Sequence, residues 1–115
     1  MTKLYGIPNC DSVRKARQWL DGRGIAYVFH DFRKDGLDAK QVAAWVKQAG
    51  WETLLNRKGT TWRQLPTGQR EGINAQRAQA LMLEQPTLIK RPVLETGKHL
   101  EVGFDADHYT TLFKG

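Results

Sequence analysis

A strand, a helix and a second strand follow one another near the start of the chain, and this order constrains the fold more than any other feature. Residues 3–7 have the side chains of a short buried strand, which Pro8 and Asn9 end. Residues 11–20 carry apolar side chains at helical spacing, and residues 27–32 are rich in aromatic and β-branched types. Two strands joined by one helix lie parallel, with a right-handed crossover. A βαβ unit is therefore predicted.

The rest of the chain indicates a helical middle, then two strands and a last helix. Helical segments are predicted at 38–49, 51–55, 61–65 and 74–84. Residues 93–102 are typical of a β-hairpin that turns at 96–98. Asp38, Asn74 and Asp105 are placed to cap helices that follow them. The order β-α-β, helices, β-β-α predicts an α/β, thioredoxin-like fold with a four-stranded mixed sheet and an all-helical insertion.

A single domain accommodates the whole chain. Its 115 residues, 40% of them hydrophobic, suffice for one modest core. From the order of elements we expect one domain at 1–115, with its thioredoxin-like core at about 1–35 and 86–115. The helical insertion then occupies about 36–85.

The chain carries an excess of positive charge. Lys and Arg number 18 against 12 Asp and Glu, so the net charge is +6. Such a charge would attract nucleic acid, an acidic protein surface or an anion such as glutathione. The basic residues that gather around Trp62 are Arg57, Lys58, Arg63 and Arg70. Because no nucleic-acid motif accompanies them, a solvated basic face is the better interpretation, and no direct nucleic-acid contact is expected.

No segment of the sequence has the length and apolarity of a membrane span. No apolar run approaches about 20 residues, and the first residues lack the apolar stretch of a secretory signal. The single cysteine, Cys10, cannot form an intramolecular disulfide, so nothing indicates an oxidising compartment. We expect a cytoplasmic protein without membrane contact, and we also expect a monomer.

Cys10 lies where the first predicted strand passes into the first predicted helix. There its thiol faces the unpaired N–H groups of the first helical turn, which together with the helix dipole favour the thiolate. Thiolate is the nucleophilic form, so Cys10 is the candidate catalytic residue. Arg14 and Lys15 add positive potential and Asp11 opposes it, a balance that the sequence leaves open. The alternative is a small buried core residue, but the polar and turn-forming neighbours of Cys10 favour a loop tip.

Other kinds of chemistry find little support in the residue pattern. His30, His99 and His108 lie far apart without metal-ligand spacing, so no metal site is expected. No phosphate-binding glycine motif is present, which leaves nucleotide hydrolysis without support. The four tryptophans are expected to fill the core rather than to stack on a ligand.

Three segments occur in the order and spacing of a known family. They are residues 5–10 (YGIPNC), 55–65 (LNRKGTTWRQL) and 88–93 (LIKRPV). Together they resemble the arsenate-reductase-related ArsC family, which includes the ArsC enzymes, the Spx transcription regulators and the small YffB proteins. The likeness runs nearly end to end and is greatest to the YffB proteins, for which glutathione-dependent thiol reduction is suspected.

The resemblance implies roles for three residues. Cys10 falls on the family's active-site cysteine, Arg91 on the arginine before the family's cis-proline, and Pro92 on that proline. By this resemblance, the Arg91–Pro92 bond is expected to be cis and to pack beside Cys10. X-Pro bonds are the ones commonly found cis, so the expectation is physically permissible.

The departures from the family restrict the chemistry. Arsenate reductases surround the oxyanion with three arginines, of which only Arg91 has a clear counterpart here. The second position falls on Asn56, where the adjacent Arg57 could substitute, and the third falls near Gly103. Each missing charge-assisted donor is worth about 1.5–3 kcal/mol, so arsenate reduction is not expected. The Cys-x-x-Cys switch typical of Spx is absent too, because Val13 stands at its second position.

Oxidised Cys10 must therefore be resolved by an external thiol, for which glutathione is the obvious candidate. The leading hypothesis is a glutathione-dependent monothiol reductase, a thiol–disulfide oxidoreductase with glutathione as co-substrate and no bound cofactor. Arg91 would hold an anionic group with help from Arg14 and Arg57, and Asn9 would line the thiolate site. The alternative is a non-enzymatic, Spx-like regulator that contacts RNA polymerase.

Overall fold

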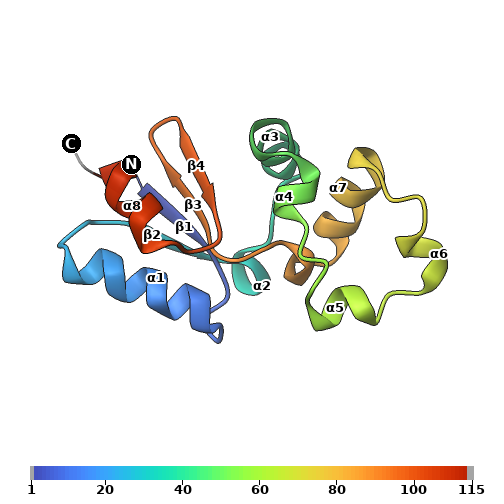
Figure 1. The fold of residues 1–115 in the computed structure, drawn as a ribbon, viewed down its shortest axis with the longest axis horizontal. Coiled ribbons are helices and arrows are strands. Elements are labelled where there is room, and N and C mark those ends of the chain that lie inside the picture. The colour runs from blue at the N-terminus through green and yellow to red at the C-terminus, as the bar shows by residue number, and fades with distance from the viewer. Residues whose placement is uncertain (1, 114–115) are drawn as a thin grey trace. The chain divides into compact units, whose positions relative to one another are not determined.

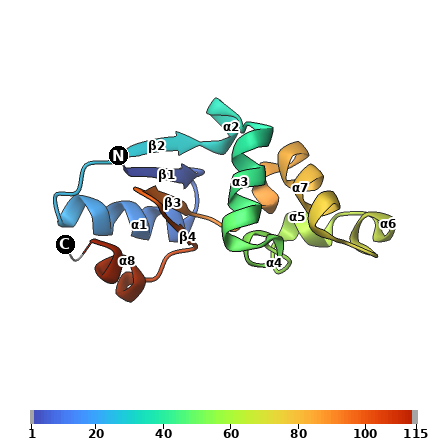
Figure 2. The ribbon, with the colours of Figure 1, turned by 90° about the horizontal axis from the view of Figure 1, so that it is seen from above.

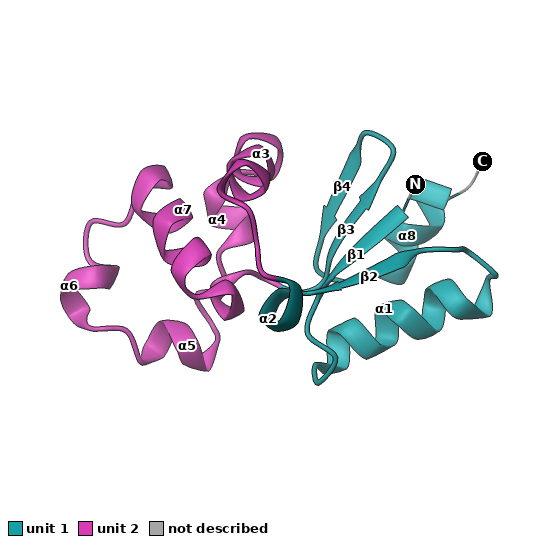
Figure 3. Ribbon diagram, turned by 180° about the vertical axis from the view of Figure 1, so that it is seen from behind, with its two compact units in different colours: residues 1–35, 91–115 teal, residues 36–90 magenta. Residues whose placement is uncertain are grey.

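The chain forms two compact units. The computed structural model describes residues 2–113. Met1–Asp35 and Arg91–Gly115 form one of them, called here the sheet unit, and Gly36–Lys90 form the helical unit (Figure 3). Cys10 and Arg91 thus belong to the same unit, although 81 positions separate them in the sequence.

The sheet unit is built on four strands in the order β2-β1-β3-β4 (Figures 1 and 2). The strands are β1 (Thr2–Gly6), β2 (Val28–Asp31), β3 (Val93–Thr96) and β4 (His99–Val102). β1 runs parallel to β2 and antiparallel to β3, and β3 pairs antiparallel with β4. The hairpin turns at Gly97, whose φ of 58° is a conformation that favours glycine. The predicted βαβ unit and the α/β, thioredoxin-like fold with its four-stranded mixed sheet are confirmed.

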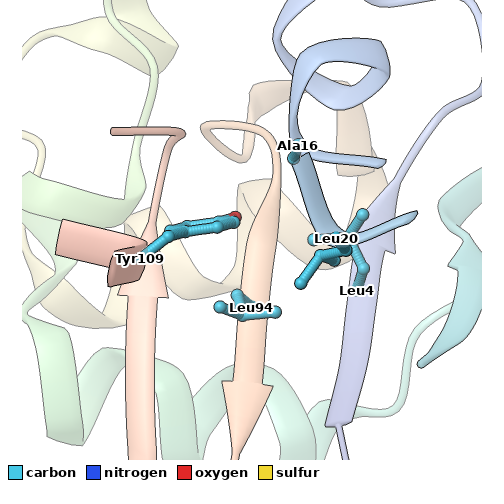
Figure 4. Close-up of a cluster of buried hydrophobic side chains, with 5 residues drawn as sticks. All are labelled: Leu4, Ala16, Leu20, Leu94 and Tyr109. Carbon is cyan, nitrogen blue, oxygen red and sulfur yellow. The ribbon is translucent and has the colours of Figure 1, made fainter. Parts of the chain in front are cut away.

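Two helices pack on one face of this sheet, α1 (Asp11–Gly22) and α8 (Ala106–Phe113) (Figure 2). Leu4 of β1 lies opposite Leu94 of β3, so both side chains point to that face. Ala16 and Leu20 of α1 and Tyr109 of α8 complete a fully buried cluster with them (Figure 4). This cluster fixes α1 against β1, and it thereby fixes the turn between them that carries Cys10.

The helical unit contains two longer helices, α3 (Ala39–Ala49) and α7 (Ala75–Glu84). Its other helices are short: α4 (Trp51–Leu54), α5 (Thr60–Arg63), α6 (Thr67–Arg70) and the 3₁₀ turn η1 (Pro86–Leu88). α3 packs against α4 and α7. The predicted caps are confirmed, because Asp38 accepts a hydrogen bond from the Lys40 amide and Asn74 accepts one from the Arg77 amide, each at 2.9 Å.

The helical unit extends to Lys90, beyond the end expected near residue 85. Two backbone hydrogen bonds of 2.8 Å explain the difference: the Asn56 amide donates to the Leu88 carbonyl, and the Lys90 amide donates to the Leu54 carbonyl. Ile89 is fully buried. The segment after α7 is therefore hydrogen-bonded to the segment at the end of α4. Helical periodicity does not predict this long-range pairing.

Some local expectations were wrong. Phe32 ends no strand but begins a short helix, α2 (Phe32–Asp35), because the Asp31 carboxylate accepts a hydrogen bond from the Arg33 amide at 2.9 Å. Of the four tryptophans only Trp45 is fully buried, and the other three are half-buried. Trp19, for example, packs edge-on against the Tyr109 ring with centroids 5.4 Å apart, and the Arg23 guanidinium lies 4.4 Å from the centre of its ring.

Candidate active site around Cys10

The pairing of β1 with β3 brings the residues that follow β1 and those that precede β3 together at one edge of the sheet. Tyr5, near the end of β1, lies opposite Val93, the first residue of β3. Because the strands are antiparallel, the residues that follow β1 and those that precede β3 leave the sheet at the same edge. Cys10 and Arg91 are such residues, and the structure brings them into contact.

Cys10 is the N-cap residue of α1. Its backbone is extended, with φ of −146° and ψ of 128°, and its carbonyl accepts the first helical hydrogen bond from the Arg14 amide at 2.9 Å. The side chain is neither sealed in the core nor fully exposed, and the thiol is free. The alternative of a buried core cysteine is therefore wrong.

The pKa of the Cys10 thiol is lowered below its ordinary value. Partial burial acts in the other direction, because desolvation disfavours the anion. The Val13 amide, the Arg91 guanidinium with its positive charge, and the Ser12 amide all lower the pKa and together outweigh burial. The N–H groups at the start of a helix and one cation thus both favour the thiolate.

Arg91 is held in place by the backbone around it. The Arg91–Pro92 peptide bond is cis, which confirms the expectation carried by the resemblance. Pro92 is buried, and its carbonyl accepts a hydrogen bond from the Gly103 amide at 2.8 Å. β3 begins at the next residue, Val93. The arginine is therefore attached directly to the sheet.

The Arg14 side chain contacts both Asp11 and Asn9. The Arg14 guanidinium pairs with the Asp11 carboxylate and donates a 3.3 Å hydrogen bond to Asn9 Oδ1. All three residues are exposed. The balance that the sequence left open is decided by this pair: Asp11 compensates the charge of Arg14, and Arg91 is the cation that lowers the pKa of Cys10.

Asn56 and Arg57 belong to the helical unit, and the role in holding an anion that was predicted for Arg57 stays a prediction. Asn56 Oδ1 accepts a hydrogen bond from the Lys58 amide at 3.1 Å. The Arg57 guanidinium lies 5.8 Å from the centre of the Trp51 ring.

Sequence reasoning missed the importance of Gly6. A Cβ atom at this position would lie 2.7 Å from Cγ2 of Val13, so only glycine lets β1 approach the first turn of α1 this closely. A signal was present, because a glycine inside a predicted strand often marks a close approach of another segment. Gly6 thus helps to position the amides that face Cys10.

Within residues 2–113, no group of three or more His, Cys, Asp or Glu side chains is arranged to hold a metal ion. In the same part of the chain, no helix has both the length and the apolar character required to span a membrane.

The comparisons with known proteins agree with this geometry. The model of the ArsC family matches residues 5–112. This chain belongs to the ArsC family. Among solved structures, the YFFB protein matches the fold of this ArsC-family chain with a TM-score of 0.94 at 46% identity, covering 96% of this chain and 97% of that one. The likeness expected from three short segments is thereby confirmed.

Two sequence relatives extend the comparison. An uncharacterized protein of Haemophilus influenzae is 41% identical over 114 residues, which are 98% of this chain and 99% of that protein. The global transcriptional regulator Spx 1 of Lactococcus lactis is 27% identical over 109 residues, covering 93% of this chain and 84% of the regulator. The ArsC-family chain therefore has both a near relative without a known role and a more distant one that regulates transcription.

Proposed function

We propose that this ArsC-family chain is a glutathione-dependent monothiol reductase with Cys10 as its nucleophile. One observation carries the proposal: a partly exposed sulfur contacts the Val13 and Ser12 amides and the Arg91 guanidinium, which together lower its pKa. A thiolate of this kind attacks disulfide sulfurs by exchange.

The reaction proceeds by two exchanges. The Cys10 thiolate attacks the glutathione sulfur of a mixed disulfide between a substrate thiol and glutathione, forming a Cys10–glutathione disulfide. The substrate leaves as a thiolate and takes a proton from water. A second glutathione thiolate then attacks the glutathione sulfur bound to Cys10, which restores the Cys10 thiolate and releases glutathione disulfide. The second thiol must come from outside, because Val13 occupies the place of a resolving cysteine.

Arg91 has a different task in each half of the cycle. In the resting protein its guanidinium stabilises the Cys10 thiolate. Once the sulfur is in a disulfide, it carries no charge, and the guanidinium becomes available to a carboxylate of glutathione. In this proposal Asn9 lines the thiolate and Pro92 carries Arg91 on the sheet.

Arsenate reduction does not fit the same residues. A tetrahedral oxyanion needs several charge-assisted donors around it, each worth about 1.5–3 kcal/mol. Of the three arginine positions of the arsenate reductases, only that of Arg91 is occupied by arginine here, with Asn56 and Gly103 near the others. We expect no turnover of arsenate at concentrations that support disulfide exchange.

Incubation with glutathione disulfide tests the proposal directly. Mass spectrometry should find one glutathione per chain, on Cys10, and added glutathione should remove it. Cys10→Ser should give no adduct and should still unfold in a cooperative urea transition, which shows that the variant is folded. Arg91→Gln should slow adduct formation because it raises the pKa of Cys10. Failure of the unmodified protein to form the adduct at neutral pH would refute the proposed reaction.

A second candidate function is regulation without catalysis, through the contact with RNA polymerase that the resemblance to the Spx regulators implies. The observation that favours it is the 27% identity to Spx 1 over 93% of this chain. Purified polymerase should then retain the chain at low salt, and Cys10→Ser should bind as well as the unmodified protein. A column that retains nothing would eliminate this candidate and leave the reductase.

A further inference from the structure

The helical unit contains a polar groove of its own. Its volume is about 340 Å³, within the range of about 300–1,000 Å³ common for small-molecule sites. Arg57 and Lys58 line it from the segment after α4, and Lys90 lines it from the segment after η1. Glu52 of α4 supplies one carboxylate to the same lining.

The loop that carries two of these cations is fixed by its own hydrogen bonds. The Asn56 amide donates to the Leu88 carbonyl at 2.8 Å, and Asn56 Oδ1 accepts from the Lys58 amide at 3.1 Å. Gly59 lies so close that a Cβ there would be 2.8 Å from Asn56 Nδ2. The Lys90 amide donates to the Leu54 carbonyl at 2.8 Å. The backbone that carries all three cations is therefore ordered without a ligand, which reduces the conformational entropy lost on binding.

The three cations are exposed and have no carboxylate partner within residues 2–113. Arg57 contacts the face of Trp51 instead, with its guanidinium 5.8 Å from the ring centre. Glu52 likewise has no cation within ion-pair distance in the part of the chain described. The groove thus presents three uncompensated positive groups and one uncompensated negative group to solvent.

We infer that this groove binds an amino acid or short peptide that carries two carboxylates and one ammonium group. Two carboxylates match the cations, and the ammonium matches Glu52. A carboxylate in the lining disfavours a compact anion such as phosphate, because like charges brought together repel. Glutathione has this set of charged groups. The inference concerns the helical unit alone, and it holds or fails independently of the reaction at Cys10.

Titration of the full chain with S-methylglutathione, followed by NMR, tests the inference, because this probe cannot exchange with Cys10. We expect saturable shifts in the amides of residues 52–58 and Lys90 at concentrations on the order of millimolar. The double variant Lys58→Gln/Lys90→Gln should bind about tenfold more weakly, since each exposed charge pair contributes up to about fivefold. Lys47→Gln and Arg63→Gln change the net charge outside the groove and should bind as the unmodified protein does.

Glu52→Gln distinguishes a site for a zwitterion from a site for any anion. It should weaken binding of S-methylglutathione and strengthen binding of inorganic phosphate. Tighter binding of both probes would overturn the assignment of the ammonium to Glu52. Shifts spread over the whole chain, or equal binding by the double variant and Lys47→Gln, would overturn the site itself. A groove that fails these tests leaves adduct formation on Cys10 unaffected, so the two proposals are refuted separately.

Discussion

Replacing Gly6 by alanine tests how the contact between β1 and α1 holds Cys10 in position. The new Cβ would lie 2.7 Å from Cγ2 of Val13, about 1 Å inside the normal contact distance of about 3.5–4.0 Å. Val13 is fully buried, and its branched side chain has few alternative rotamers. The strand and the first turn of the helix must therefore move apart.

The cost follows from two opposing effects. Overpacking of this size destabilises by about 1–3 kcal/mol, and the lower entropy of the unfolded chain offsets about 0.4–1 kcal/mol. We expect the free energy of unfolding in urea to fall by about 1–2 kcal/mol. Because the Val13 amide helps to lower the pKa of Cys10, a displaced helix should also raise the midpoint pH for alkylation of the thiol.

Two further variants separate this contact from a general effect of alanine. Val13→Ala leaves Cβ of residue 13, which would lie 3.7 Å from the new atom at position 6, an ordinary contact. Gly6→Ala should then cost less in the Val13→Ala background than alone. Gly22→Ala has no atom within 4 Å of its Cβ and should be neutral or stabilising by up to about 1 kcal/mol. Strict additivity, or an unchanged alkylation midpoint in Gly6→Ala, would refute the reasoning.

Arg91→Gln removes a cation and a hydrogen-bond donor, so the pKa of Cys10 should rise. The rate of Cys10 alkylation as a function of pH measures this pKa. An unchanged midpoint would show that the helix amides alone lower the pKa of Cys10. Folding lowers the pKa of Cys10, so the thiolate stabilises the fold fully above the unfolded pKa, and this stability is lost as pH falls through the folded pKa. The difference in unfolding free energy between the unmodified protein and Cys10→Ser should therefore grow as pH rises from the folded pKa to the unfolded pKa. A difference that does not change with pH would contradict this prediction. Tyr109 has a buried hydroxyl without a hydrogen-bond partner within residues 2–113. Tyr109→Phe should therefore be neutral or slightly stabilising in urea unfolding, whereas Tyr109→Ala should lower the free energy of unfolding by about 3–5 kcal/mol. A large loss of stability in Tyr109→Phe would show that the hydroxyl is hydrogen-bonded. The pKa of His108 is raised because its ring bonds to the Glu101 carboxylate, so its NMR titration should have a midpoint above 6.5 that Glu101→Gln lowers; equal midpoints would exclude the contact.

Local structure was largely predictable from local sequence. Asp38, Asn74 and Asp105 each start a helix at the expected place, because capping needs only a side-chain oxygen and the amides two or three residues further on. The extent of the helical unit was not predictable. It depends on the pairing of Leu54 and Asn56 with residues more than thirty positions later, and helical periodicity carries no information about such partners.

In the candidate site, too, some features were predictable from local sequence and others depend on contacts between distant residues. Cys10 could be identified as an activated thiol because the Ser12 and Val13 amides that face it are its close neighbours in the chain. Arg91 was expected only through the family resemblance. Its contact with Cys10 requires β1 to pair with β3, and many arginines in this basic chain were equally available. Arg14, the nearest cation in the sequence, is instead compensated by Asp11.

The sequence by itself determined that a thiol would stand at the start of a helix, because strand, break and helix follow one another within a few residues. Only the tertiary structure decided which cation reaches that thiol and how closely strand and helix approach. Both depend on strand register and on the packing of Gly6 against Val13, and these form between buried surfaces of the folded chain rather than between neighbours along it.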